Sequence, residues 1–368
     1  MNETIGDFET LYESHLKAQH GVIWKDSVAW YSLHGLEQTL KLSQEIVNGT
    51  YKAKPPITFT IYKPKQREII SIHYRDRVYQ KPLNDLYLYP IMTRSFVKEN
   101  GACQKGRGID YERNEIFKKQ LRKYYINNGS NGYVLQIDLK QYYKSLDHEL
   151  VNQMFKAKLP EDIYELTKEV LENQYPGNVG YNPGSQMVQI AGISYLNGLD
   201  HFIKEKLHVK YYSRYMDDLV LISQSKKFLE HCRTEIEKEL IAKKLTMHPT
   251  KTKITKLPDG ITYLGFNWRL TETGKVIQTV KSQTVKDLKR TVNRLFKLYA
   301  KGKRSLECVQ SSYTTRCSYI KKCNSYKLLT RLDAWYKERN HYYGVQRKRL
   351  DAHRKSNFNE YTGKGGAA

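Results

Sequence analysis

The chain has 368 residues, of which 39% are hydrophobic and 12% aromatic, and this composition excludes a wholly disordered protein. Its 62 Lys and Arg residues outnumber 38 Asp and Glu residues, giving a formal net charge of +24. Positive side chains in such excess repel one another in a compact chain, and a polyanionic partner would relieve this repulsion. The charge therefore indicates binding to a polyanion such as nucleic acid rather than a surface that only promotes solubility.

The numbers of tyrosine and cysteine residues further restrict the functional class of the protein. The chain has 30 Tyr against 10 Phe and 4 Trp. Tyrosine rings stack on unpaired bases, although many are simply core or strand residues. The five cysteines form no CxxC pair, which indicates neither a zinc knuckle nor a disulfide framework. Without a signal-peptide pattern or an apolar run of membrane length, we expect a cytoplasmic protein with no membrane partner.

The first 56 residues are predicted to form an N-terminal helical extension. Apolar residues recur there at helical spacing until Pro55-Pro56 breaks the pattern. Residues 57–62 then alternate like a strand, and a second β-prone run follows a basic turn. The turn carries Lys65 and Arg67, which form either a cationic hairpin tip that holds phosphate or a plain solvated turn.

An acid ends a predicted strand near the middle of the chain. Residues 101–108 form a glycine-rich basic loop, which is either approached by a nucleic-acid backbone or a flexible surface loop. A basic helix over 111–126 leads to the apolar strand 133–138. Its last residue, Asp138, is costly to bury without a metal; the alternative is a turn or N-cap residue.

Two adjacent acids, Asp217 and Asp218, lie between two β-prone runs that predict a hairpin. Adjacent carboxylates repel each other, and Mg²⁺ favours such ligands; the alternative is two solvated turn residues. If the strand that ends at Asp138 neighbours this hairpin, three carboxylates come together. Two Mg²⁺ ions held there can activate a primer 3′-hydroxyl and stabilise the leaving pyrophosphate.

The remainder is predicted to be mostly helical. Between 281 and 350, 19 Lys and Arg residues face only 4 acids, which suits a helical grip on a duplex backbone, the alternative being a solvated basic face. Helices are expected over 161–174, from the loop at 176–186 to about 206, and over 226–244, with a strand over 261–266.

In this order the motifs resemble a reverse transcriptase over about residues 57–270. The resemblance implies an α+β right-hand polymerase. Residues 57–274 would form the fingers and palm, an antiparallel sheet with helices, and residues 275–350 a basic α-helical thumb. The N-terminal extension, 1–56, would precede them, and a flexible tail, 351–368, would follow.

The resemblance also implies roles for single residues. Asp138 matches the first catalytic acid, and Asp217 and Asp218 match the Tyr-x-Asp-Asp pair; all three would hold two Mg²⁺ ions, for which Mn²⁺ could substitute. Pro183 stands where the family commonly has glutamine, and its effect on the nucleotide pocket is left open. The implied nucleotide-binding residues are Lys65, Arg67, Tyr143 (a steric gate against the ribose 2′-hydroxyl), Gly184 and Lys251, and the implied primer grip is Tyr263, Leu264, Gly265 and Phe266.

The implied activity is RNA-directed DNA synthesis on a dedicated structured RNA. Residues 100–106 and the Tyr-Met-Asp-Asp form resemble bacterial enzymes of diversity-generating retroelements and of unknown groups, the latter similar to enzymes of anti-phage defence; retron and group II intron enzymes rank lower. The implied partners are a structured non-coding RNA template, dNTPs, the cDNA product in an RNA–DNA hybrid, and an accessory protein or a second copy.

Two alternatives come from other classes. An RNA-binding scaffold with a degenerate polymerase fold is opposed by the intact acids. An RNA-templated RNA polymerase is opposed by Tyr143 as a gate.

Overall fold

The computed structural model describes residues 5–62 and 66–363, except for the side chains of 354–363. The chain forms two compact units, which we describe separately. The first comprises Met1–Tyr124 and Gly132–Thr255, and the second comprises Tyr125–Asn131 and Lys256–Ala368. Lys65 lies outside the described residues. The mixed helical and antiparallel-sheet architecture confirms the predicted α+β class.

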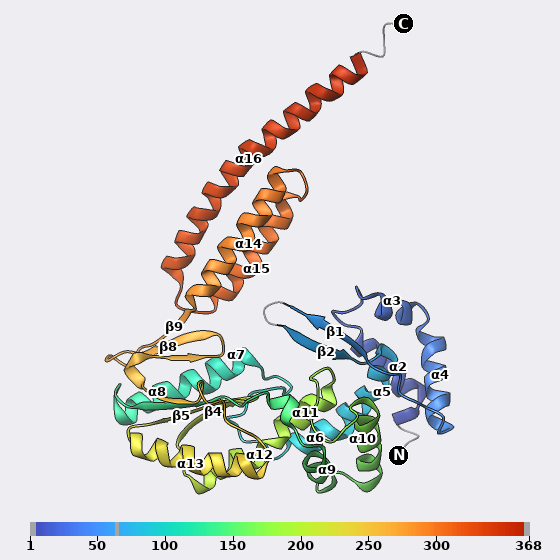
Figure 1. The fold of residues 1–368 in the computed structure, drawn as a ribbon, viewed down its shortest axis with the longest axis vertical. Helices are drawn as coiled ribbons and strands as arrows, with labels where there is room; N and C mark the ends of the chain where they lie inside the picture. The colour runs from blue at the N-terminus through green and yellow to red at the C-terminus, as the bar shows by residue number, and fades with distance from the viewer. Residues whose placement is uncertain (1–4, 63–65, 364–368) are drawn as a thin grey trace. The chain divides into compact units, whose positions relative to one another are not determined.

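A four-stranded sheet organises the first unit, in the order β4-β5-β3-β6, and Figure 1 labels its strands β4 and β5. The strands β3 and β5 pair antiparallel, as do β4 and β5. The central strands are apolar on both faces because α13 packs against β3 and β5, while the η2 segment packs against β4. The bounds are β3 Tyr133–Ile137, β4 Tyr211–Tyr215, β5 Asp218–Ser223, β6 Lys253–Lys256, α13 Lys226–Ala242 and η2 Glu112–Phe117.

Helices make up the rest of the first unit, together with a two-stranded hairpin of β1 and β2. The helices predicted within the first 50 residues are confirmed, and so is the strand predicted over 57–62, which appears as β1. The bounds are α2 Phe8–Ala18, α3 Asp26–Leu33, α4 Gly35–Val47, β1 Ile57–Ile61, β2 Arg67–Ser71, α5 Tyr74–Pro82, η1 Leu83–Leu88, α6 Tyr89–Thr93, α7 Ile109–Tyr111, α8 Lys118–Asn128, η3 Tyr142–Ser145, α9 His148–Lys156, α10 Glu161–Gln174, α11 Gln186–Tyr195, α12 Asn197–His201 and η4 Phe202–Lys206.

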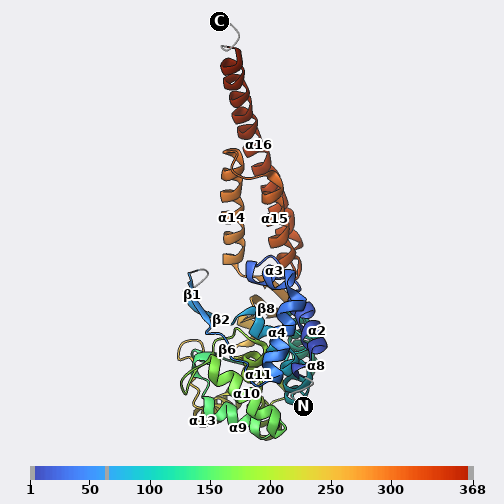
Figure 2. The same ribbon diagram turned by 90° about the vertical axis from the view of Figure 1, so that its right-hand side faces the viewer.

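The second unit joins a three-stranded antiparallel sheet, β7-β8-β9, to three helices. Helix α16 runs along α14 and α15 and continues beyond them, as both ribbon views show (Figures 1 and 2). Phe296 and Tyr343 stack at 5.5 Å between ring centroids, which fixes α14 on α16. The bounds are η5 Leu257–Asp259, β7 Ile261–Tyr263, β8 Phe266–Leu270, β9 Val276–Val280, α14 Ser282–Ala300, α15 Leu306–Lys321 and α16 Tyr326–Gly363.

Two details differ from the sequence prediction. The single strand expected over 261–266 is wrong, because the chain reverses at Leu264 and Gly265, whose φ angles are +49° and +85°. A two-residue turn with both φ angles positive matches the twist of the flanking strands. The backbone of α16 is helical to Gly363, so the expected tail begins as part of a long helix; its flexibility stays a prediction.

The predicted four-part division into extension, fingers and palm, thumb and tail also stays a prediction. No helix among the described residues is long and apolar enough to cross a membrane.

Candidate active site

Asp138 follows β3 and lies beside the connection after α13. The backbone N–H of His248 donates to the Asp138 carbonyl at 2.7 Å, and the Asp138 N–H donates to the Thr252 hydroxyl at 3.4 Å. Lys251 Nζ lies 2.5 Å from Asp138 Oδ2. The basic connection after α13 thus places Lys251, which is predicted to bind the triphosphate, in contact with Asp138, the first predicted catalytic acid.

Asp217 lies in the tight turn between β4 and β5. Tyr215 and Asp218 are the last paired residues, so Met216 and Asp217 form the two-residue loop. Met216 has φ +58°, a left-handed conformation that is uncommon for a side chain of this kind. Ile137 pairs with Leu219, which places Asp138 next to the position of Asp218 across the β3–β5 pair.

The Asp138 carboxylate acts electrostatically on Asp217. The pKa of Asp217 is raised, first because burial disfavours its charged form and then because Asp138 repels it. Lys251 and Arg214 oppose this increase. Two carboxylates held in mutual repulsion beside one lysine are a donor set that suits a divalent cation with oxygen ligands.

The third predicted acid, Asp218, is exposed, unlike Asp217. Within the described ranges, no group of three or more His, Cys, Asp or Glu residues could hold a metal ion. The three-acid site therefore stays a prediction.

Tyr143, the predicted gate, packs under α11 close to these acids. A Cβ added at Gly192 of α11 would lie only 2.9 Å from the Tyr143 ring. The position of this ring therefore requires glycine at residue 192. Burial raises the pKa of the Tyr143 hydroxyl, and Cys103 and Asp217 raise it further. The hydroxyl oxygen is buried without a hydrogen-bond partner.

Gly184 lies directly against β2. A Cβ at this position would come within 2.7 Å of the Ile70 carbonyl oxygen, which is backbone and cannot swing away. The Asn182 side chain donates to the Glu68 carbonyl at 3.0 Å. Hence the predicted nucleotide-pocket loop is fastened to the strand that carries Arg67, which is itself exposed.

We expect Gly184→Ala to lower polymerase activity by about tenfold, because the loop or β2 must move by several tenths of an ångström. The measurement is steady-state dNTP incorporation. Gly198→Ala on α12 is the matched control, since a Cβ at this exposed position meets nothing nearer than Lys243 Nζ at 3.9 Å. Equal activity of both variants would contradict the expected contact.

The predicted primer grip forms a turn in the second unit. Leu264 and Gly265 are the turn residues, and Phe266 stacks on Tyr319 of α15 at 4.9 Å between ring centroids. A Cβ on Gly265 would meet the Tyr319 hydroxyl at 2.5 Å. The turn is therefore fixed on α15, and its role in holding a primer stays a prediction.

Sequence reasoning missed a set of buried charges behind the β4–β5 turn. Arg214 and Asp200 are both fully buried and form a two-point ion pair. Burial alone would lower the pKa of Arg214, but the Asp200 carboxylate raises it, so the guanidinium stays charged. The available signal was a single arginine in a strand otherwise made of aromatic and small residues.

Glu112 is a second buried charge that was missed. Its side chain is fully buried and accepts a hydrogen bond from the Ser213 hydroxyl. Burial raises the pKa of Glu112 to about 8, against an ordinary value of 4.5. Nothing in the sequence distinguishes Glu112 from an exposed glutamate at the start of a basic helix, because its raised pKa results from burial.

Glu112 predicts a pH dependence of stability. Between pH 4.5 and about 8 the folded state keeps a proton that the unfolded chain has released. Stability therefore falls as pH rises through this window. We expect the melting temperature to drop by several degrees between pH 6 and pH 9, and to drop less in Glu112→Gln, which retains the Ser213 hydrogen bond. Parallel pH profiles of the two proteins would refute this assignment.

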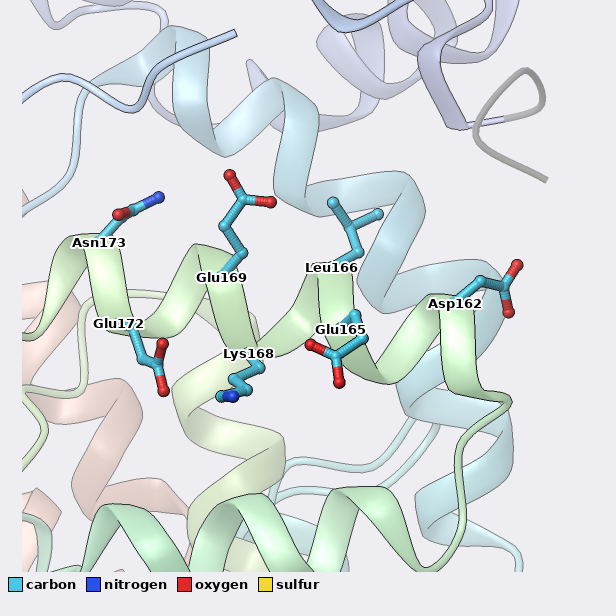
Figure 3. Close-up of a pocket in the computed structure, with 7 residues that line it drawn as sticks. All are labelled: Asp162, Glu165, Leu166, Lys168, Glu169, Glu172 and Asn173. Atoms are coloured by element: carbon cyan, nitrogen blue, oxygen red, sulfur yellow. The ribbon is translucent and has the colours of Figure 1, made fainter. Parts of the chain in front are cut away.

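A pocket of about 730 Å³ lies on α10, away from the predicted site residues (Figure 3). Four carboxylates line it, and Figure 3 shows their side chains projecting from the helix. Such a surface repels phosphate, so this pocket does not suit a nucleotide. The carboxylates are Asp162, Glu165, Glu169 and Glu172.

Asp138 after β3, Asp217 in the β4–β5 turn and Lys251 after α13 thus lie in one region of the first unit. The sequence model of the family described as reverse transcriptase (RNA-dependent DNA polymerase) matches residues 57–268. The chain belongs to the reverse transcriptase family. No curated protein sequence matches the chain.

The similar solved structures include three telomerases. That of Candida albicans, in complex with the TWJ fragment of telomeric RNA, is 12% identical with a TM-score of 0.47, over 80% of this chain and 60% of that one. That of Candida tropicalis with the TWJ fragment is 13% identical with a TM-score of 0.45, over 77% and 56%. An apo Candida tropicalis telomerase truncated from the C-terminal domain is 14% identical with a TM-score of 0.44, over 61% and 56%. The matched region thus covers about 60% or less of the length of these proteins. The similarity is too distant for a function to be inferred from it.

Proposed function

We propose that the chain is an active RNA-directed DNA polymerase that extends a primer with deoxynucleotides. The observation that carries the proposal is the ion pair of Asp138 with Lys251 at the end of β3, next to the β4–β5 turn that contains Asp217, in a chain of the reverse transcriptase family. An inactive scaffold has no need to keep carboxylates at the end of one strand and in the turn of the neighbouring hairpin, because they repel each other without a bound cation.

Asp138 and Asp217 are the residues that would hold divalent metal, with Asp218 as the third predicted ligand. When bound, Mg²⁺ supplies charge that activates the primer 3′-hydroxyl and stabilises the leaving pyrophosphate. Mn²⁺ is expected to substitute.

The chain's own groups do the rest. Lys251 now neutralises Asp138, and its flexible ammonium is free to swing to a triphosphate oxygen when nucleotide binds. Lys65 and Arg67 would meet the same triphosphate from the β1–β2 turn. Tyr143 would close the pocket against a ribose 2′-hydroxyl. Tyr263, Leu264, Gly265 and Phe266 would hold the primer.

A direct assay tests the proposal. The purified chain is incubated with an RNA template annealed to a DNA primer, Mg²⁺ and labelled dNTPs, with EDTA and rNTP reactions alongside. We expect metal-dependent dNTP incorporation. Incorporation of rNTPs alone would favour an RNA-templated RNA polymerase, and no incorporation, even on RNA that co-purifies with the chain, would favour the scaffold.

The template and the biological role are finer proposals. The net charge of +15 over residues 281–350 supports a partner with a duplex backbone, for which an RNA–DNA hybrid is the product of the proposed reaction. We propose a dedicated structured RNA as template, in anti-phage defence or a diversity-generating retroelement. Sequencing the RNA and cDNA that co-purify with the protein would decide this.

A further inference from the structure

Arg214 joins four separate segments from a fully buried position. Its guanidinium donates through Nε to Asp200 Oδ1 at 2.7 Å and through Nη2 to Asp200 Oδ2 at 2.5 Å. Nη2 also lies 3.2 Å from the Ile193 carbonyl of α11. Its backbone N–H donates to the Glu99 carbonyl at 2.9 Å, which links β4 to the loop before Gly101.

The remaining arm of Arg214 reaches the turn itself. Nη1 donates to the carbonyl oxygen of Met216 at 2.9 Å. Met216 is the residue with φ +58°, and Asp217 follows it directly. A left-handed conformation is unfavourable for such a residue, so it persists only where the surroundings impose it.

Asp200 supports this arrangement from α12. Besides the guanidinium, its carboxylate accepts from the Tyr212 hydroxyl at 2.6 Å. The planar guanidinium is thus fixed in one orientation by two oxygens of a carboxylate that cannot move. A lysine has no such fork and could not bind Asp200 at two points while also reaching Met216.

We propose that Arg214, oriented by Asp200, is the positioning residue that holds the Met216 turn in its left-handed form and so aims Asp217 at Asp138. The inference rests on the proposed polymerase function. Arg214 does not touch the reacting groups, since its contacts are Asp200 and backbone carbonyls. It acts on the turn through the hydrogen bond to the Met216 carbonyl, and its charge also lowers the pKa of Asp217, an effect that Arg214→Lys retains.

The test removes the ion pair without leaving a buried charge. In Arg214→Met/Asp200→Asn both residues are neutral, and the asparagine oxygen still accepts from Tyr212. Dislocation of Asp217 by about 1 Å should lower kcat for dNTP incorporation about 10²-fold, with the KM for dNTP changed less than about threefold. Arg214→Lys should be impaired similarly, although it keeps the charge.

Two further measurements separate positioning from stability. Hydrogen exchange of the 215–218 amides should be faster by about tenfold in the double variant, with other protected amides little changed. Adding Met216→Asn, a residue that tolerates the left-handed region, should restore kcat several-fold. A merely structural role for Arg214 would not be rescued by a turn residue.

The matched control is Lys204→Met/Glu99→Gln. This ion pair, 3.1 Å long, joins the buried Glu99 of the loop before Gly101 to Lys204 of η4, and neither side chain is in the β4–β5 turn. The proposal is overturned if the control lowers kcat equally, if turn exchange is unchanged, or if Met216→Asn brings no recovery. If the wild-type chain incorporates no dNTP, the proposed function fails, and the exchange measurement alone still tests the positioning.

Discussion

Asp217→Asn is expected to abolish dNTP incorporation, with a loss of about 10³-fold or more. The substitution preserves shape but removes the negative charge that would bind divalent metal at the turn. Steady-state incorporation on a primed RNA template measures the loss. Asp162→Asn, a neutralised carboxylate on α10 outside the site, is the matched control and should remain active.

The same substitution should not destabilise the fold. The pKa of Asp217 is raised by burial and by repulsion from Asp138, so its charge costs stability at neutral pH. In EDTA, the melting temperature of Asp217→Asn should equal or exceed that of the wild type. An inactive variant that also melts much earlier would show a structural role instead, and an active one would rule out Asp217 as a metal ligand.

Tyr143→Ala is expected to relax sugar discrimination. Tyr143 belongs to η3, and its ring lies against α11, where a Cβ at Gly192 would be only 2.9 Å away, so little space is left behind the ring on that side. Removing it should raise the ratio of rNTP to dNTP efficiency by about 10²-fold. Single-nucleotide incorporation with matched dNTP and rNTP measures this ratio.

Tyr143→Phe provides the control for the hydroxyl. The oxygen is buried without a partner, so its loss should leave the fold as stable or slightly more stable. The ring remains, and discrimination should persist. If phenylalanine relaxes selection as much as alanine does, the steric explanation is wrong and the hydroxyl itself is responsible.

Some expectations followed from local pattern alone. Strand β3 ends one residue before Asp138, and the Tyr-Met-Asp-Asp hairpin forms as predicted, because apolar β-prone runs flank polar turn residues. The local pattern predicts a strand through Leu264, since leucine rarely adopts a positive φ and no turn residue precedes Gly265, and only the resemblance implies the turn that the structure has there.

Other expectations could not be settled locally. The sequence indicated three acids of equal standing, but in the folded hairpin Asp217 lies in the turn and is partly buried, whereas Asp218 begins β5 and is exposed. Gly184 and Gly192 carried no packing signal in the sequence, because the groups they approach, Ile70 and Tyr143, lie far along the chain.

By itself, the sequence determined the family, the strands that carry the acids and the basic character of the C-terminal helices, because motif order and charge are properties of the chain. Only the tertiary structure decided that Arg214 and Asp200 meet behind the turn and that Glu112 is buried enough to keep a proton near neutral pH. The reason is that a charged residue type can lie either at the surface or in the core. Only folding determines how far its side chain is exposed to solvent and which group it contacts.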